Sequence, residues 1–228
     1  MKDADPGHDT RGHRARLRRR LAEGGGEALL DHELVEYLLA LTIPRIDTKP
    51  IARRLLDEFG GIGPLLSAAP ETLANAGVSE AAAAALQIAQ AAALRLLKSA
   101  VAERPVLGSW QALSDYLHAA MAHRATESAR VLHLNVRNVL IRDELVSEGS
   151  VDQAAIHVRE VVRRALELHS SAIILVHNHP SGDPAPSKQD IAITREIVAA
   201  CRPLGIVVHD HVIVGSKGQA SLRSLGLM

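Results

Sequence analysis

Apolar residues in the first half of the chain recur at the spacing of amphipathic helices. Leucines, isoleucines and alanines return every three or four positions, which gathers them on one helix face. The segments with this spacing cover residues 27–40, 51–59 and 80–102. Glycines and prolines stand between these segments, where helices commonly end and begin. The pattern predicts a small all-α domain over residues 21–104.

The spacing of the apolar residues changes in the second half. Short runs rich in valine, isoleucine and leucine are typical of strands, whereas two longer segments keep the helical spacing. The expected strands cover residues 131–136, 139–146, 172–176 and 206–214, and the expected helices cover 157–169 and 188–202. Arg137 and Asn138 lie between the first two strands and suit a tight turn. We therefore expect an α+β (α/β-like) domain over residues 105–228, with a mixed sheet flanked by helices.

Composition limits the classes of protein to which the chain can belong. The 228 residues include 26 Lys plus Arg and 26 Asp plus Glu, so the net charge indicates neither a nucleic-acid nor a membrane partner. Aromatic residues make up only 2%, which argues against a base-stacking surface. The single cysteine, Cys201, excludes an internal disulfide and suits a reducing compartment. Without a long apolar run or a signal-peptide pattern, we expect a cytosolic protein with no membrane partner.

Basic residues concentrate near the N-terminus. The segment 11–20 is rich in arginine, and acidic residues elsewhere in the chain do not neutralise it locally. Such a segment can follow DNA phosphates, or it can be a solvated helix face or a mobile tail. We expect residues 1–20 to form a basic, flexible tail. Its candidate DNA contacts are Arg14, Arg16, Arg18, Arg19 and Arg20.

Two glycine turns in the helical domain resemble those of helix-hairpin-helix modules, in which a Gly-apolar-Gly turn presents backbone amides to a DNA phosphate. The first turn is Gly61-Ile62-Gly63, and the second, Gly77-Val78-Ser79, has serine in place of the second glycine. Serine adopts positive φ less readily than glycine, and no basic residue follows within 81–85, so the second turn is less suited to a phosphate. A helical bundle that packs on itself or on a partner is an equally good interpretation.

The strongest chemical signal follows the third expected strand. His177 and His179 are two residues apart, so they leave the end of strand 172–176 on the same face. A stiff, proline-rich loop then leads to a helix whose first turn contains Asp190. Two imidazoles and a carboxylate, with a fourth position open to water, are the ligand set of a catalytic zinc site. Ser187 and Asp190 also fit a helix-capping pattern, which explains them without a metal but leaves the histidine pair unexplained.

This arrangement, His177-x-His179 followed by Ser187 and Asp190, resembles the JAMM motif of MPN-domain metalloproteases. The longer string His-Asn-His-Pro-Ser-Gly, which ends at Gly182, resembles the bacterial RadC branch of that superfamily. The resemblance extends over most of the chain and implies a fold similar to that of cytidine deaminases. It also implies one Zn²⁺ per chain, bound by His177, His179 and Asp190, and hydrolysis of a peptide or isopeptide bond in a peptide or protein substrate, in the bacterial cytosol. The alternative function is a DNA-associated role in repair or recombination, which the RadC name suggests.

The resemblance further implies a general base and an oxyanion donor. The base in the family is a glutamate on an early strand, and Glu127, just before the first expected strand, matches that position; Glu144 and Glu148 are the alternatives. Ser187 matches the serine that helps to stabilise the oxyanion, a role that competes with helix capping. Asn178 points to the opposite face of its strand, so we expect it to hold the loop and not the metal.

A second His-x-His pattern, His209-Asp210-His211, lies within the last expected strand. An aspartate between two histidines in a strand suits an internal hydrogen-bond network or support for metal ligands. We therefore expect this pattern to be structural. An unpaired edge strand in the sheet would make an oligomer possible.

Overall fold

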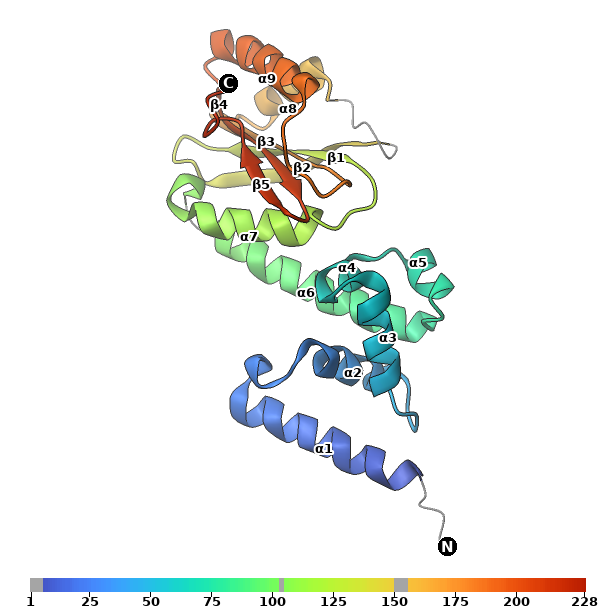
Figure 1. Cartoon of the computed structure of the whole chain (residues 1–228). Helices are drawn as coiled ribbons and strands as arrows, with labels where there is room; N and C mark the ends of the chain where they lie inside the picture. Colours follow the sequence, from blue (N-terminus) through green and yellow to red (C-terminus); the bar gives the residue numbers. More distant parts are fainter. Residues whose placement is uncertain (1–5, 103–104, 150–155) are drawn as a thin grey trace, which may run out of the picture. The chain divides into compact units, whose positions relative to one another are not determined.

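The structure is a computed structural model that describes residues 6–102, 105–149 and 156–228 (Figure 1). It divides into two compact units, Met1–Ala92 and Ala93–Met228. The division falls within helix α6 (Glu80–Ala102). The boundary expected from the sequence lies between residues 104 and 105, and residue 104 lies outside the described residues.

The first unit consists of helices in its described residues. They are α1 (Pro6–Gly24), a 3-10 turn (Gly26–Ala28), α2 (Asp31–Thr42), α3 (Lys49–Phe59), α4 (Ile62–Ser67), α5 (Pro70–Asn75) and the N-terminal part of α6. Apolar residues from α2 to α6 form one core, in which Val35, Leu39, Leu55 and Leu86 are fully buried. These residues come from the segments with helical spacing, and the expected all-α region is confirmed.

The basic N-terminal segment is not a flexible tail in its described part. From Pro6 onward it forms α1, and Leu17 on this helix is only 1% exposed. Leu17 within the arginine-rich run lets the helix bury one side, and Arg16, Arg18 and Arg19 are exposed. The expectation of a tail is therefore wrong for residues 6–20, and residues 1–5 lie outside the described residues.

Glycine turns join α3 to α4 and α5 to α6. Gly60 and Gly77 have φ values of 78° and 76°, the left-handed conformation with which helices commonly end. Ser79 directly precedes α6, and its Oγ accepts a hydrogen bond from the backbone N–H of Ala82 at 3.3 Å. The serine that replaces the second glycine of the turn therefore caps the next helix.

The second unit contains a five-stranded mixed sheet between helices (Figure 1). Its strands are β1 (Ser128–Leu134), β2 (Leu140–Glu148), β3 (Ala172–Asn178), β4 (Val207–Gly215) and β5 (Gly218–Ser221); its helices are α7 (Trp110–Met121), α8 (Val158–Glu167) and α9 (Lys188–Cys201), with 3-10 turns at Val106–Ser109 and Arg202–Leu204. In the order β2-β1-β3-β4-β5, β3 and β4 are parallel and all other neighbours are antiparallel. The α+β fold class is confirmed, and the short β5 is an addition to the four expected strands.

The central strand β3 is buried along its whole length, and its alternate residues belong to two cores. Ile174 and Val176 belong to the core formed with α7, whereas Ile173 and Leu175 belong to the core formed with α8 and α9. Figure 1 shows α7 on one face of the sheet and α8 and α9 on the other. Because side chains alternate along a strand, the pleat directs the ring of His177 toward α9.

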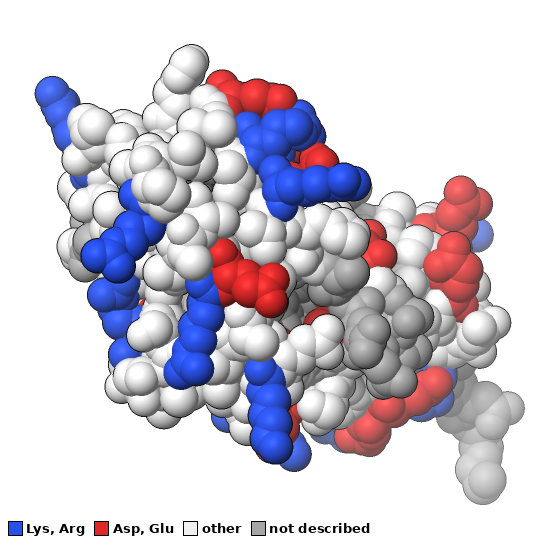
Figure 2. Space-filling view, turned by 90° about the horizontal axis from the view of Figure 1, so that it is seen from above, with Lys and Arg blue, Asp and Glu red and all other residues white. Residues whose placement is uncertain are grey.

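Charged side chains of both signs share the surface. On the face drawn in Figure 2, Lys and Arg side chains are spread among Asp and Glu side chains, with uncharged surface between them. This distribution agrees with the equal numbers of basic and acidic residues. Within the described ranges, none of the helices combines the length and apolar character that a bilayer-spanning helix needs.

Candidate metal centre

His177, His179 and Asp190 come together where β3 ends and α9 begins. The pleat of β3 directs His177 toward α9, and the loop after His179 returns the chain so that Ser187 and Asp190 open that helix. Gly182 in this loop has a φ of 81°, which favours glycine. Both histidines and the carboxylate are therefore mounted at the ends of two regular elements.

One ligand atom from each of these three residues lies within 4.8 Å of the others. Nε2 of His177 is 3.0 Å from Nε2 of His179 and 3.3 Å from Oδ1 of Asp190. Nε2 of His179 is 3.6 Å from Oδ2 of Asp190. In the described part of the chain, this is the one group of three or more His, Cys, Asp or Glu side chains arranged so that it could hold a metal ion. Two imidazole nitrogens and a carboxylate oxygen around one point fit zinc.

Hydrogen bonds at the far nitrogens orient both imidazole rings. Nδ1 of His179 lies 2.8 Å from the backbone oxygen of Asp183, and Nδ1 of His177 lies 2.8 Å from Nε2 of His211. In turn, Nδ1 of His211 lies 2.5 Å from Oγ1 of Thr194 on α9. Both metal-site rings therefore present Nε2 to the centre. Thr194 is not among the predicted site residues, because a threonine within a helix gives no sign of such a contact.

Burial and the carboxylate determine the charges in the site. Burial lowers the pKa of His177 to about 4, so this ring is neutral at pH 7. Contact with Asp190 is the main cause that raises the pKa of His179. Burial alone would raise the pKa of Asp190, but the two histidines and Ser187 outweigh it and hold that pKa below its ordinary value. A neutral His177 and an ionised Asp190 are the forms that bind a cation.

Glu127 directly precedes β1 and lies beside the histidines. Ala129 pairs with His177 in the antiparallel register of β1 and β3, so Glu127, two residues earlier, lies level with His179. The negative charge of Glu127 contributes to the raised pKa of His179, which places its carboxylate near that ring. Glu127 is not one of the three residues whose ligand atoms converge, so it is available for proton transfer.

Asn178 holds the segment that carries Glu127. Its Oδ1 accepts hydrogen bonds from the backbone N–H and the hydroxyl of Ser128, at 2.9 and 2.7 Å, and its Nδ2 donates to the backbone oxygen of Thr126 at 3.1 Å. These bonds bracket Glu127 on both sides, and Asn178 is only 1% exposed. As expected, none of these side-chain hydrogen bonds goes to His177, His179 or Asp190, but the segment that Asn178 holds is the start of β1 and not the loop.

Ser187 caps α9. Its Oγ accepts a hydrogen bond from the backbone N–H of Asp190 at 3.1 Å, and Oδ2 of Asp190 accepts one from the backbone N–H of Ser187 at 2.7 Å. This reciprocal pair is a capping box. The cap uses the hydroxyl oxygen as an acceptor, so the hydroxyl hydrogen remains available to donate elsewhere.

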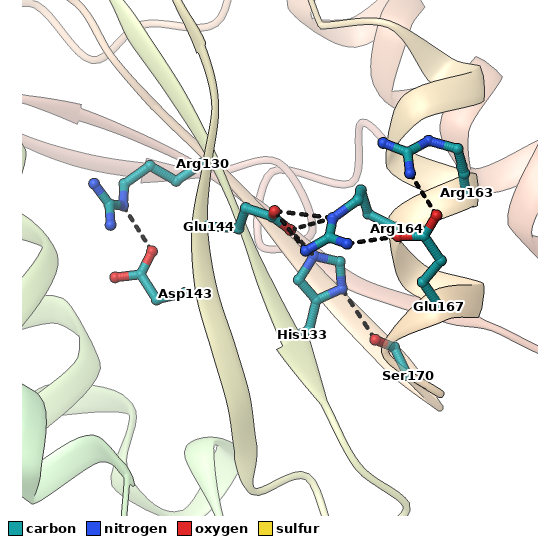
Figure 3. Close-up of polar contacts among 8 residues, drawn as sticks. All are labelled: Arg130, His133, Asp143, Glu144, Arg163, Arg164, Glu167 and Ser170. Carbon is teal, nitrogen blue, oxygen red and sulfur yellow. Dashed lines mark hydrogen bonds and ion pairs between the residues drawn. The ribbon is translucent and has the colours of Figure 1, made fainter.

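The two alternative glutamates are engaged elsewhere. Glu144 on β2 pairs with Arg164 of α8 at 2.7 Å, and its Oε2 lies 3.5 Å from Nε2 of His133 (Figure 3). Glu148 pairs with Arg124. The candidate directly before β1 is therefore the one that the structure brings to the metal-site histidines.

The second His-x-His pattern forms an internal network, as expected. His209 contacts Oδ1 of Asn138 through Nε2 at 2.7 Å, and Asp210 accepts hydrogen bonds from the hydroxyl of Ser221 at 2.5 Å and from the backbone N–H of Arg223 at 3.1 Å. The contacts of Asp210 connect β4 to β5 and to the residues after it, and the contact of His209 connects β4 to the turn between β1 and β2. His211 is fully buried directly behind the first metal-site histidine.

The five arginines predicted to contact DNA have different surroundings. Arg14 donates to the backbone oxygens of Ile43 and Ile46, at 3.3 and 2.6 Å. Arg20 pairs with Glu33 at 2.6 Å, and this hydrogen bond is the main cause of the lowered pKa of that glutamate. These two arginines therefore hold α1 to the rest of its unit. Arg16, Arg18 and Arg19 are exposed, and Arg20 is exposed too, although it has an ion-pair partner in Glu33.

Comparisons with known proteins place the chain among relatives that match most of its length. Residues 107–227 match a family model described as a RadC-like JAB domain. A UPF0758 protein of Rhodobacter capsulatus is 54% identical over 213 residues, which cover 93% of this chain and 100% of the relative. A UPF0758 protein of Ruegeria pomeroyi is 50% identical over 219 residues, which cover 96% of this chain and 98% of the relative. The chain therefore belongs to the family of proteins with a RadC-like JAB domain.

Proposed function

We propose that this protein is a zinc-dependent hydrolase of peptide or isopeptide bonds, with one Zn²⁺ per chain bound by His177, His179 and Asp190. The observation that carries the proposal is the convergence of two Nε2 atoms and a carboxylate within 4.8 Å, with Glu127 beside them. A capping box or a satisfied core histidine accounts for single members of this group. Neither accounts for two imidazoles that both turn Nε2 toward one carboxylate.

The residues around the site would each have a separate role in amide hydrolysis. Zinc bound there would lower the pKa of a water molecule and polarise the scissile carbonyl. Glu127 would take the proton from that water and deliver it to the leaving amine. The hydroxyl of Ser187 would donate to the developing oxyanion with the hydrogen that the helix cap does not use.

Metal content and hydrolysis, measured on the same three proteins, test the proposal. Elemental analysis should find about one zinc per chain in the wild type and none in His177→Ala. Glu127→Gln should keep its zinc and lose about 10²- to 10⁴-fold in the hydrolysis of fluorogenic peptides or of peptides branched at a lysine side chain. Absence of zinc from a wild-type protein supplied with the metal would overturn the proposal, as would full activity of Glu127→Gln.

A second candidate function, DNA binding by the first unit, is supported by the exposed Arg16, Arg18 and Arg19 on α1. Binding through phosphates should weaken steeply as salt is added, because it releases counterions from the DNA. Replacing these three arginines by alanine should weaken binding to a labelled duplex and flatten the salt dependence. Lys188→Ala in the second unit is the matched control, since this lysine is also exposed. No binding of the wild type at low salt would end this candidate.

A further inference from the structure

A buried chain of hydrogen bonds leads from His177 to the backbone of Asp190. Nδ1 of His177 lies 2.8 Å from Nε2 of His211, and Nδ1 of His211 lies 2.5 Å from Oγ1 of Thr194. The hydroxyl of Thr194 donates to the backbone oxygen of Asp190 at 2.5 Å. The side chains of His177, His211 and Thr194 are 2%, 0% and 0% exposed, so water does not complete these bonds.

The direction of each bond in this chain follows from its last member. The backbone oxygen of Asp190 can only accept a hydrogen bond, so Thr194 must donate its single hydroxyl hydrogen to that oxygen. Thr194 then accepts from Nδ1–H of His211. A neutral His211 with its hydrogen on Nδ1 has a lone pair on Nε2, which accepts from Nδ1–H of His177. The hydrogen of His177 is thus on Nδ1, and its Nε2 carries a lone pair directed at the site.

We propose that His211 and Thr194 are positioning residues that fix the tautomer of His177 in which Nε2 is free to bind metal. Without a partner at Nδ1, a neutral imidazole carries its hydrogen mostly on Nε2, the atom that must bind zinc here. His179 receives the same orientation from a backbone oxygen, that of Asp183, which no side chain can change. The hydrogen bonds that orient His177 come instead from the side chains of His211 and Thr194, so substitution of these residues can break them.

The same series of hydrogen bonds connects the two segments that carry the proposed metal ligands, the end of β3 and the start of α9. Thr194 lies one helical turn after Asp190 on α9, while His177 and His211 lie on the neighbouring parallel strands β3 and β4. A shift of α9 along the sheet would break the contact of Thr194 with His211 and would also move Asp190. The chain therefore links the ring orientation of one ligand to the position of the other. Only its effect on metal binding rests on the proposed function.

Nitrogen NMR of the histidine rings in the metal-free protein tests the tautomer directly. In the wild type, Nε2 of His177 and Nε2 of His211 should both have the chemical shift of a nitrogen without hydrogen. Thr194→Val keeps the shape of the side chain and removes the hydroxyl, so it should populate the other tautomer of both rings. Thr194→Ser and His211→Gln are the conservative controls: serine keeps the hydroxyl, and the glutamine amide can accept from His177 and donate to Thr194.

Zinc affinity, measured by competition with a chromogenic chelator, provides the second readout. Thr194→Val should bind zinc about 10- to 100-fold more weakly, whereas Thr194→Ser should stay near the wild type. A wild-type His177 with its hydrogen on Nε2 would overturn the inference, as would unchanged affinity in a folded Thr194→Val. If Thr194→Val does not fold, the wild-type spectrum still decides the tautomer. The expected tautomer in a wild type that binds no zinc would leave this inference standing and reject the proposed function alone.

Discussion

Ser187 accepts a hydrogen bond from the first turn of α9 and keeps its own hydrogen unused. Ser187→Ala should therefore lose both the cap and the donor, with a stability cost of about 0.5–2 kcal/mol. Ser187→Asp keeps an N-cap acceptor but cannot donate when ionised, so its stability should stay close to that of the wild type. Both variants should lose about 10²- to 10³-fold in hydrolysis. Urea unfolding and peptide hydrolysis, measured together, separate the two roles, and an active Ser187→Asp would rule out the donor role.

His133 shows how buried histidines should make stability depend on pH. Its Nδ1 lies 3.0 Å from the hydroxyl of Ser170 and its Nε2 lies near Glu144 (Figure 3). Burial is the main cause that lowers the pKa of His133, against the opposing effect of Glu144. The unfolded chain therefore binds a proton more readily than the folded protein. The contribution of the neutral His133 to the free energy of unfolding should be complete above about pH 6.5, the ordinary pKa of histidine. This contribution should decrease as the pH falls below that value.

Urea unfolding of the metal-free protein between pH 7.5 and 5 measures this decrease. His133→Gln removes the titrating ring, so it should show a smaller decrease than the wild type over the same range. The burial of His177 and His211 also lowers their pKa values, so part of the decrease should remain in the variant. Equal slopes in the two proteins would contradict the role given to His133. His157→Gln is the control, because this histidine is exposed.

Single residues in the site differ in how far sequence alone identifies them. His177, His179 and Asp190 lie within one short stretch, so local spacing was enough to predict their convergence. Glu127 could be assigned only through the family resemblance, because its position beside His179 depends on the pairing of β1 with β3. The role of Thr194 depends on the packing of α9 against β4, and nothing local in the sequence reveals it.

The turn between β4 and β5 holds the loop that carries His179. The backbone N–H of Lys217 donates to the oxygen of Gly182 at 3.0 Å, and the backbone N–H of His179 donates to that of Val214 at 2.9 Å. A Cβ atom added at Gly215 would lie only 2.3 Å from the oxygen of Gly182. The oxygen of Gly182 is a backbone atom and a Cβ is fixed to the backbone of residue 215, so no side-chain rotation relieves this clash and the loop would have to move.

Gly215→Ala should therefore weaken zinc binding as well as stability, although Gly215 contributes no ligand. We expect zinc affinity to fall about tenfold or more, which the chelator competition would measure. Gly108→Ala is the matched control in the same unit, because a Cβ atom there meets nothing within 4 Å. Wild-type affinity in Gly215→Ala would mean that the loop tolerates the shift and that the β4–β5 turn does not position His179.

Elements with a strong periodic pattern were predicted better than those that depend on distant contacts. The strands β1 to β4 and the helices α8 and α9 were found because their apolar residues face buried cores. The strand β5 is only partly buried and consists of Gly218–Ser221, so it has no such pattern. The sequence of α1 predicts a tail because arginines outnumber the apolar residues in it, and Leu17 alone gives little signal of burial.

At the scale of the whole molecule, the second unit begins earlier than the family match. The family model starts at residue 107, but the compact unit starts at Ala93 and includes the last part of α6. Val101 on this helix is fully buried in the core with α7, and Leu97 packs against that core. Nζ of Lys98 also lies 3.8 Å from the buried carboxylate of Asp143. The end of α6 therefore belongs structurally to the second unit, which contains the candidate metal centre.

Two fragments test this boundary. The fragment 93–228 should fold, whereas the fragment 105–228 should be less stable by at least the contribution of one buried valine, about 1.5–3 kcal/mol, because it lacks Val101 and Leu97. Urea unfolding of both fragments measures the difference. Val101→Ala in the longer fragment should lose part of the same stability, which separates the lost packing from a general effect of shortening the chain. Equal stability of the two fragments would place the boundary at residue 105 and reduce the end of α6 to a connection between the units.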